Sequence, residues 1–291
     1  MAVLSTLLQQ AEVVVADSSL CATLHVLHNL ASMDFSRNSK IDLERRDQYL
    51  AAGARLFLTN TFDSGRLHLQ NIGLSHTVHS INRRAVAATK QLFADVEPYV
   101  AVAGGIGFIS EHVPHAEQVN AIAEQVSALA EGGADLLWAE SLSSIDQIDA
   151  LLAGCALGAP DLDLVATLAF RPNHTDPFKM TPASAAKRLV QANQIAALGV
   201  DTTNGDWRLE QSLAAVKLAT FGKVLVAKAD SDTLTVNTHL EPNALLQLTQ
   251  MARTVVQLGT RIFALDRRAT VEQLRAVSDT LNAQSSRLAN V

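Results

Sequence analysis

Short apolar runs, each too brief to form a helix, recur along this chain and alternate with longer segments that have helical spacing. Each run ends in a polar or glycine-rich step, as a buried strand does before the helix that follows it. This repeat predicts alternating β and α structure with a parallel sheet. The eight runs are Val13–Asp17, Arg55–Asn60, Val100–Ile106, Asp135–Glu140, Leu164–Phe170, Leu198–Thr203, Lys223–Lys228 and Arg261–Asp266.

The segments between the runs are rich in Ala, Leu, Gln and Glu, and we predict that they are helices. Thr181-Pro182 supplies an N-cap residue followed by proline at the first helical position, and Glu241-Pro242 marks another helix entrance. We expect a long loop from His25 to Leu43 that adds a short extra element. The predicted helices are Ser80–Ala94, Ala116–Glu131, Ser144–Leu152, Pro182–Ala197, Glu210–Ala219, Glu241–Gln257 and Thr270–Ser286.

Eight such units in 291 residues fit an α/β fold of the (β/α)₈ TIM barrel type, which typically takes about 250 residues. An open doubly wound sheet is the competing arrangement. It would place a glycine-rich G-x-G-x-x-G turn after the first strand, whereas the segment from Asp17 to Ala22 contains no glycine. Since no linker, low-complexity stretch or block of charge interrupts the chain, we predict one barrel domain over residues 1–291.

The charge and cysteine content exclude several classes of protein. With 23 Lys plus Arg against 29 Asp plus Glu, the net charge is -6 and no basic cluster would attract nucleic acid or an anionic membrane. The longest apolar runs fall well short of the roughly 20 residues that cross a bilayer. Two cysteines cannot build a disulfide framework, and the first residues lack the features of a signal peptide. We expect a cytoplasmic protein without nucleic-acid or membrane partners.

Candidate functional residues stand where the predicted strands end, because the loops that follow the strands of such a barrel meet at one face. Asp17 and Glu140 end apolar strands, where a carboxylate is costly to bury unless a ligand or a donor compensates it, although each could instead cap a helix or pair with a cation. Lys228 could form a Schiff base, or could pair with Asp230 or Asp266. The other strand-end candidates are Thr59, Asn60, Thr61, Gly104, Gly105, Gly107, Arg171, His174, Asp201, Thr202, Thr203, Asn204 and Arg267.

Several segments, in order and spacing, carry a resemblance to a known family. They read VVVADSSLCATL, YLAAGARLFLTNTF, INRRAVAATK, VAVAGGIGF, ALAEGGADLLWAES and MTPASAA. The chain resembles the homocysteine S-methyltransferases, which include betaine-dependent and S-methylmethionine-dependent enzymes and the homocysteine module of cobalamin-dependent methionine synthase. The resemblance spans nearly the whole chain and implies a barrel fold.

The resemblance also implies a zinc site, from which this chain departs. The family holds zinc through one cysteine in a G-V-N-C motif after the sixth strand and two in G-G-C-C-G-T after the eighth, and zinc keeps the substrate sulfur as a thiolate. The matching segments here read GVDT and ALDRR, so Thr202, Asp266 and Arg267 stand at the cysteine positions. Neither Cys21 nor Cys155 replaces them. We therefore expect a degenerate zinc site with no zinc and no other cofactor, while a hard cation held by Asp201, Asp230 and Asp266 is the alternative.

The resemblance further implies that Asp17, Thr59 and Glu140 line a pocket for the amino acid end of a ligand. We expect Glu140 and Asp17 to hold a ligand ammonium, and Thr59 and Asn60 to hydrogen-bond its polar end. Arg267 or Lys228 would contact an anionic group. The catalytic candidates are Glu140, Asp266 and Lys228.

The favoured hypothesis is a diverged methyltransferase, without zinc–thiolate chemistry, that acts on or binds a small amino-acid-like or methylated metabolite. One alternative is a non-catalytic relative that binds a metabolite or a partner protein, and another is a lyase that forms a Schiff base through Lys228. The resemblance leaves open a partner protein, such as a corrinoid protein. It also leaves open assembly into a homodimer.

Overall fold

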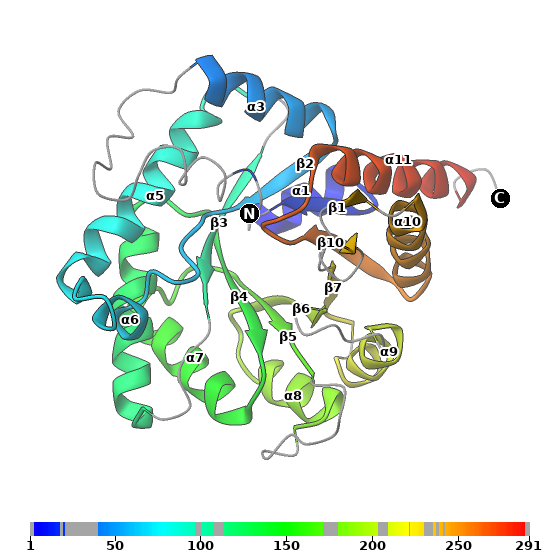
Figure 1. Cartoon of the computed structure of the whole chain (residues 1–291). Coiled ribbons are helices and arrows are strands. Elements are labelled where there is room, and N and C mark those ends of the chain that lie inside the picture. The colour runs from blue at the N-terminus through cyan, green and yellow to red at the C-terminus, as the bar shows by residue number, and fades with distance from the viewer. Residues whose placement is uncertain are drawn as a thin grey trace.

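Eight parallel strands close into a barrel in the computed structural model of the chain (Figure 1). Their order around the ring is β1-β10-β7-β6-β5-β4-β3-β2, which confirms the predicted (β/α)₈ TIM barrel. The structure describes residues 3–17, 20, 40–96, 100–107, 113–170, 180–202, 209–220, 222–229, 235–236, 239–240 and 242–288. The strands are β1 (Val14–Asp17), β2 (Ala54–Leu58), β3 (Ala101–Ile106), β4 (Leu136–Leu142), β5 (Leu164–Leu168), β6 (Ile195–Asp201), β7 (Val224–Ala229) and β10 (Thr260–Leu265).

Helices form the outer layer around this barrel (Figure 1). The short strands β8 (Thr235–Val236) and β9 (His239–Leu240) pair with each other in an antiparallel hairpin. None of the helices in the described ranges has the length and apolar character needed to cross a membrane. The helices are α1 (Val3–Gln10), α3 (Lys40–Ala51), α4 (Arg66–Gln70), η1 (Ser75–Thr77), α5 (Val78–Leu92), α6 (His115–Glu131), α7 (Ile145–Gly158), α8 (Pro182–Leu189), α9 (Leu209–Ala219), α10 (Pro242–Gln257) and α11 (Val271–Leu288).

Three of the predicted segments differ clearly from the observed elements, and the first of them is α7, which continues to Gly158 rather than ending at Leu152. α8 starts as predicted, with the Thr181 hydroxyl accepting a hydrogen bond from the Ser184 N–H at 3.1 Å, but it ends at Leu189 rather than at Ala197. Ile195 already pairs with β5, so pairing within the barrel overrides the helical propensity of this alanine-rich segment. α3 begins at Lys40, inside the predicted loop, while residues 25–39 of that loop lie outside the described residues.

The barrel interior is apolar toward the amino-terminal ends of the strands. Alternate residues of each strand point inward, and at this end they are hydrophobic. Trp138 of β4 is fully buried there, and Leu4 and Leu7 of α1 join the same cluster. Since α1 directly precedes β1, these two leucines close the amino-terminal end of the barrel. The sequence patterns did not predict this helix. The inward-facing strand residues include Val14, Ala16, Leu56, Leu58, Ala101, Ala103, Leu136, Val165, Ala197, Val226, Ile262 and Ala264.

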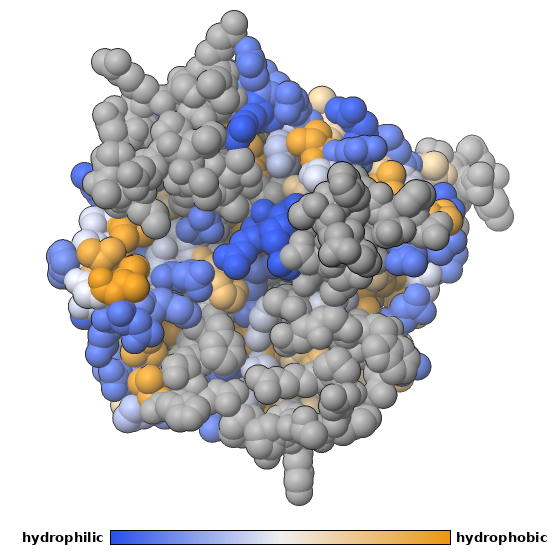
Figure 2. All heavy atoms as spheres, viewed as in Figure 1, coloured by the Kyte–Doolittle hydropathy of each residue, from blue (hydrophilic) through white to orange (hydrophobic). Residues whose placement is uncertain are grey.

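The same alternation turns polar toward the carboxyl ends of the strands. Glu140 on β4, Thr167 on β5, Lys228 on β7 and Asp266 after β10 each stand two residues beyond an inward apolar position, and Asp201 on β6 stands four residues beyond the inward Ala197. Outward residues between them pack against the helices in the main hydrophobic cluster. The polar layer therefore lies at the barrel mouth, and Figure 2 shows hydrophilic side chains near the centre of the face that Figure 1 views.

Candidate functional site

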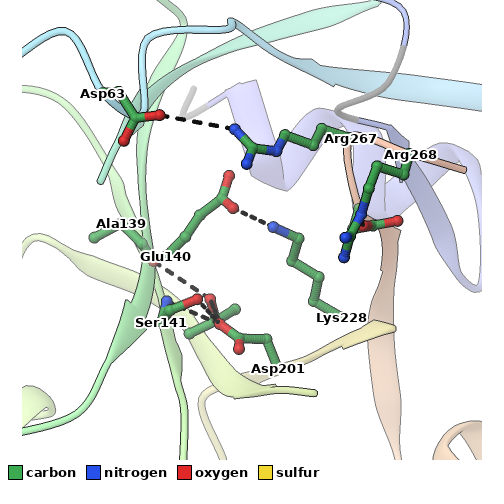
Figure 3. A network of polar contacts seen from close by, with 10 residues as sticks. Asp63, Ala139, Glu140, Ser141, Asp201, Lys228, Arg267 and Arg268 are labelled. Carbon is green, nitrogen blue, oxygen red and sulfur yellow. Dashed lines mark hydrogen bonds and ion pairs between the residues drawn. The ribbon is translucent and has the colours of Figure 1, made fainter. Parts of the chain in front are cut away.

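A buried ion pair joins opposite sides of the barrel mouth. The Lys228 ammonium donates to Oε2 of Glu140, and the two side chains point toward each other from β7 and β4 (Figure 3). Their exposed fractions are only 5% and 12%. Burial by itself lowers the pKa of Lys228, but the charges of Glu140, Asp201 and Asp266 outweigh it, so the pKa of this ammonium is raised. Lys228 is therefore a permanent cation near neutral pH.

Asp201 fixes the backbone beside Glu140. Its Oδ2 accepts hydrogen bonds from the Ser141 N–H at 2.8 Å, the Ser141 hydroxyl at 3.1 Å and the Thr167 hydroxyl at 2.8 Å. Ser141 has φ 59°, a left-handed conformation that is unfavourable for a residue with a side chain, and the register of β4 against β5 shifts at this point. The Asp201 carboxylate thus holds a strained bulge that sets the direction of Glu140.

Two arginines lie at the rim after β10. Nε of Arg268 donates to Oδ2 of Asp266 at 3.0 Å, and the Asp266 side chain is largely buried. Arg267 is 60% exposed and lies 3.7 Å from Asp63, an exposed residue after β2, so this pair is loose and screened by water (Figure 3). Arg267 is consequently a cation that a bound molecule can reach.

Asp17, at the end of β1, and Thr59, after β2, each accept a hydrogen bond from a backbone N–H group. Oδ2 of the fully buried Asp17 accepts a hydrogen bond from the Leu20 N–H at 2.9 Å. The Thr59 hydroxyl accepts from the Gly105 N–H at 3.0 Å and bonds the Thr61 hydroxyl at 2.8 Å, which ties β2 to β3. Asn60 is half-buried, and its side chain makes no hydrogen bond within the described ranges. The ligand contacts that we assigned to these residues stay predictions.

The glycines in and just after β3 do not open a space at the mouth. A Cβ on Gly105 would lie 2.8 Å from the Thr59 carbonyl oxygen, and one on Gly107 would lie 2.1 Å from that of Phe62. A Cβ on Gly104 would meet Leu129 at 3.0 Å. These glycines therefore permit close packing against neighbouring elements. The candidates Arg171, His174, Thr203, Asn204 and Asp230 lie outside the described residues.

The residues at the family's cysteine positions do not fit a zinc ion. Thr202 is buried, Asp266 bonds Arg268, and Arg267 brings a guanidinium to the rim. Zinc favours thiolate and imidazole ligands and is repelled by fixed cations such as the nearby Lys228. In the part of the chain that the structure describes, no three His, Cys, Asp or Glu side chains are grouped to hold a metal ion.

Cys155 cannot supply the missing thiolate. It is buried near the end of α7, and because α7 runs back from the mouth, this end of the helix lies toward the opposite face of the barrel. Burial raises the pKa of its thiol to about 12, so the thiol stays protonated. Cys21 is not among the described residues.

Sequence reasoning missed two members of the site, Thr167 and Ser141. Thr167 had a signal, since it is the single polar residue of the strand Leu164–Leu168 and stands two positions after the inward Val165. No sequence signal marked Ser141, because its left-handed conformation depends on contacts with β5 and β6.

The fold and the mouth define a class of (β/α)₈ barrel protein whose polar residues gather at the carboxyl ends of the strands. The family model described as homocysteine S-methyltransferase matches residues 4–277. The chain therefore belongs to the homocysteine S-methyltransferase family, as the motifs predicted.

Solved structures agree with this fold at low sequence identity. The metallated form of the homocysteine methyltransferase MmuM from Escherichia coli is 18% identical, with a TM-score of 0.72 over 95% of this chain and 99% of that one. A methyltransferase from Methanosarcina mazei is 12% identical, with a TM-score of 0.59 over 94% of both chains. A comparison with curated proteins finds no match. At these identities the solved structures support the fold alone.

Proposed function

We propose that this chain is a diverged methyltransferase that acts on or binds a small amino-acid-like or methylated metabolite without zinc–thiolate chemistry. Its family is one of methyltransferases. The observation that carries the proposal is the buried Lys228–Glu140 pair, which lies beside Asp201 and Asp266 at the mouth in place of a cysteine centre.

The groups at the barrel mouth do not support activation of a substrate thiol. A free thiol is mostly protonated at pH 7 and is then a weak nucleophile. A nearby cation can stabilise a thiolate, but Lys228 is already paired with Glu140. We therefore propose that homocysteine is not the methyl acceptor.

The mouth offers complementary groups for a zwitterion. Glu140 uses Oε2 for Lys228, and its Oε1 makes no hydrogen bond to the described residues, so this oxygen can accept from a ligand ammonium. The half-buried Asn60 can hydrogen-bond a polar group, and the exposed Arg267 can bind a carboxylate. These contacts retain the ligand roles expected for Glu140, Asn60 and Arg267.

The lyase alternative is not favoured. A lysine must lose its proton before it attacks a carbonyl, and enzymes achieve this by lowering the pKa of the lysine. The carboxylates around Lys228 raise its pKa instead.

The first test is turnover together with ligand binding. Homocysteine with S-methylmethionine, betaine or methylcobalamin should yield no methionine, whereas a member of a panel of amino acids, betaines and methylated sulfur compounds should raise the melting temperature. A ligand at about 100 times its dissociation constant stabilises by about 2.7 kcal/mol. Methionine formation would contradict the proposal, and so would a panel without a stabiliser. Methylation of the stabilising compound would separate an enzyme from a non-catalytic binder.

The second test is the substitution Arg267→Ala. It should weaken binding of the stabilising zwitterion by about tenfold, since a hydrogen bond to a charged group is worth about 1.5–3 kcal/mol. The melting temperature of the free protein should not change, because the contact of Arg267 with Asp63 is exposed. Arg84→Ala on α5 removes the same charge at an exposed position away from the strand ends and is the matched control. Equal affinities of the two variants would show that Arg267 does not bind the ligand.

A further inference from the structure

We propose that Gln125 is a positioning residue of the barrel mouth. It fixes residues 59–64, here called the β2 loop, and thereby the place of Asn60. This inference deepens the proposed function and rests on it for the molecule that Asn60 would bind. Gln125 lies on α6, in the outer layer, so it acts on the mouth only through the loop that it holds.

The β2 loop carries two polar side chains at the mouth. Asn60 stands two residues beyond the inward Leu58 and is half-buried. Asp63 lies 3.7 Å from the guanidinium of Arg267 at the rim (Figure 3). A shift of this loop would therefore move both the amide that we assign to the ligand and the carboxylate beside Arg267.

Gln125 holds the middle of the β2 loop from the helical layer. Its side chain is buried, and its Nε2 donates to the carbonyl oxygen of Thr61 at 2.8 Å. The same nitrogen donates to Oδ1 of Asn82 on α5 at 3.3 Å. A Cβ on Gly65 would lie 2.9 Å from Oε1 of Gln125, so this amide packs closely against the backbone where α4 begins.

Asn82 holds the end of the β2 loop. It is fully buried, and its Nδ2 donates to the carbonyl oxygens of Ser64 and Val78 at 2.8 Å each. Because both amide hydrogens of Asn82 are used, its Oδ1 is left to accept from Gln125. On the barrel side the Thr61 hydroxyl donates to a carbonyl oxygen of β3 at 2.7 Å. The loop is thus held by α5, α6 and β3 together.

The chemistry of these two amides explains what they do. A buried amide is costly unless its polar atoms are hydrogen-bonded, and an apolar side chain would fill the space between two helices without that cost. Gln125 and Asn82 instead donate to backbone carbonyl groups of the β2 loop. Loss of the Gln125 amide should therefore free the loop more than it weakens the barrel.

The first measurement is hydrogen exchange of the free protein. In Gln125→Met the side chain keeps its length but loses the donor, and the Thr61 carbonyl oxygen keeps its bond from the Ser64 N–H at 3.0 Å, so the variant should fold. A peptide that covers the β2 loop should exchange at least about tenfold faster than in the native protein, while β5 should be unchanged.

Gln194→Met is the matched control. The Gln194 Nε2 also donates to two backbone carbonyl oxygens, those of Ala159 at 2.8 Å and Leu162 at 3.2 Å, but before β5 and away from the mouth. This variant should leave exchange of the β2 loop as it is in the native protein. Unchanged exchange of the loop in Gln125→Met would overturn the inference, and the same acceleration in Gln194→Met would overturn it too.

Asn82→Ala provides a second variant. It removes the donor to Ser64 and should also speed exchange of the β2 loop by at least about tenfold. If Gln125→Met does not fold, this variant decides by the same comparison with Gln194→Met.

Ligand affinity separates positioning from plain support of the fold. The probe is methionine, a zwitterion with a methylated sulfur, or else the panel member that most raises the melting temperature of the native protein. Its dissociation constant should rise at least about fivefold in Gln125→Met and stay the same in Gln194→Met. A loosened loop with unchanged affinity would show that Gln125 does not position Asn60. If no panel member binds the native protein, the proposed function fails, while hydrogen exchange still decides whether Gln125 fixes the loop.

Discussion

Replacement of Lys228 with methionine is expected to lower the free energy of unfolding by about 3–5 kcal/mol, the usual cost of leaving one partner of a buried ion pair uncompensated. Methionine keeps the length and most of the volume of the side chain, so the loss reports the charge rather than a cavity. The Lys228 and Glu140 side chains are only 5% and 12% exposed, so water screens the pair little. Urea unfolding followed by circular dichroism measures the change.

The control is the double variant Lys228→Met with Glu140→Gln. It removes both charges together, so it should recover most of the stability lost in the single variant. A loss below about 1 kcal/mol in Lys228→Met would be the size of an exposed salt bridge and would contradict the buried pair.

Replacement of Asp201 with alanine should cost about 3 kcal/mol or more, because each buried donor left without an acceptor costs about 1–3 kcal/mol. The Ser141 N–H, the Ser141 hydroxyl and the Thr167 hydroxyl all bond the same oxygen of Asp201. The strained backbone at Ser141 would also lose the contacts that hold it. The measurement is again urea unfolding.

Ser141→Gly is the matched control for this prediction. It keeps the N–H that Asp201 accepts, and glycine adopts φ 59° without strain, which offsets the lost hydroxyl contact. It should change stability by less than about 1 kcal/mol. If Asp201→Ala proved no more damaging than Ser141→Gly, the carboxylate would not be what fixes the bulge.

The barrel could be predicted because its strands are buried on both faces and read as continuous apolar runs. The run Val100–Ile106 corresponds to β3 at Ala101–Ile106, and Arg261–Asp266 corresponds to β10 at Thr260–Leu265. The least accurate prediction was the boundary between α8 and β6, where alanine suits both the helix and the barrel interior. Pairing with β5 decides that boundary, and no local pattern encodes it.

The mouth was predictable as a set of residues but not as a set of contacts. The rule that strand ends carry the site predicted Glu140, Asp201, Lys228 and Asp266. We considered Asp230 or Asp266 as partners of Lys228, whereas the observed hydrogen bond is to Glu140. Glu140 lies 88 residues away along the chain. Only closure of the barrel brings the two together, so local spacing could not identify the partner.

We propose that the Lys228–Glu140 ion pair stands at the mouth of this barrel where the family resemblance implies a zinc centre. This proposal is tested most directly by the metal content of the native protein, purified without chelators from cells supplied with zinc and measured by mass spectrometry. We predict substoichiometric zinc that dialysis removes without any change in melting temperature. Stoichiometric zinc that survives dialysis, and whose removal by a chelator lowers the melting temperature, would contradict the account.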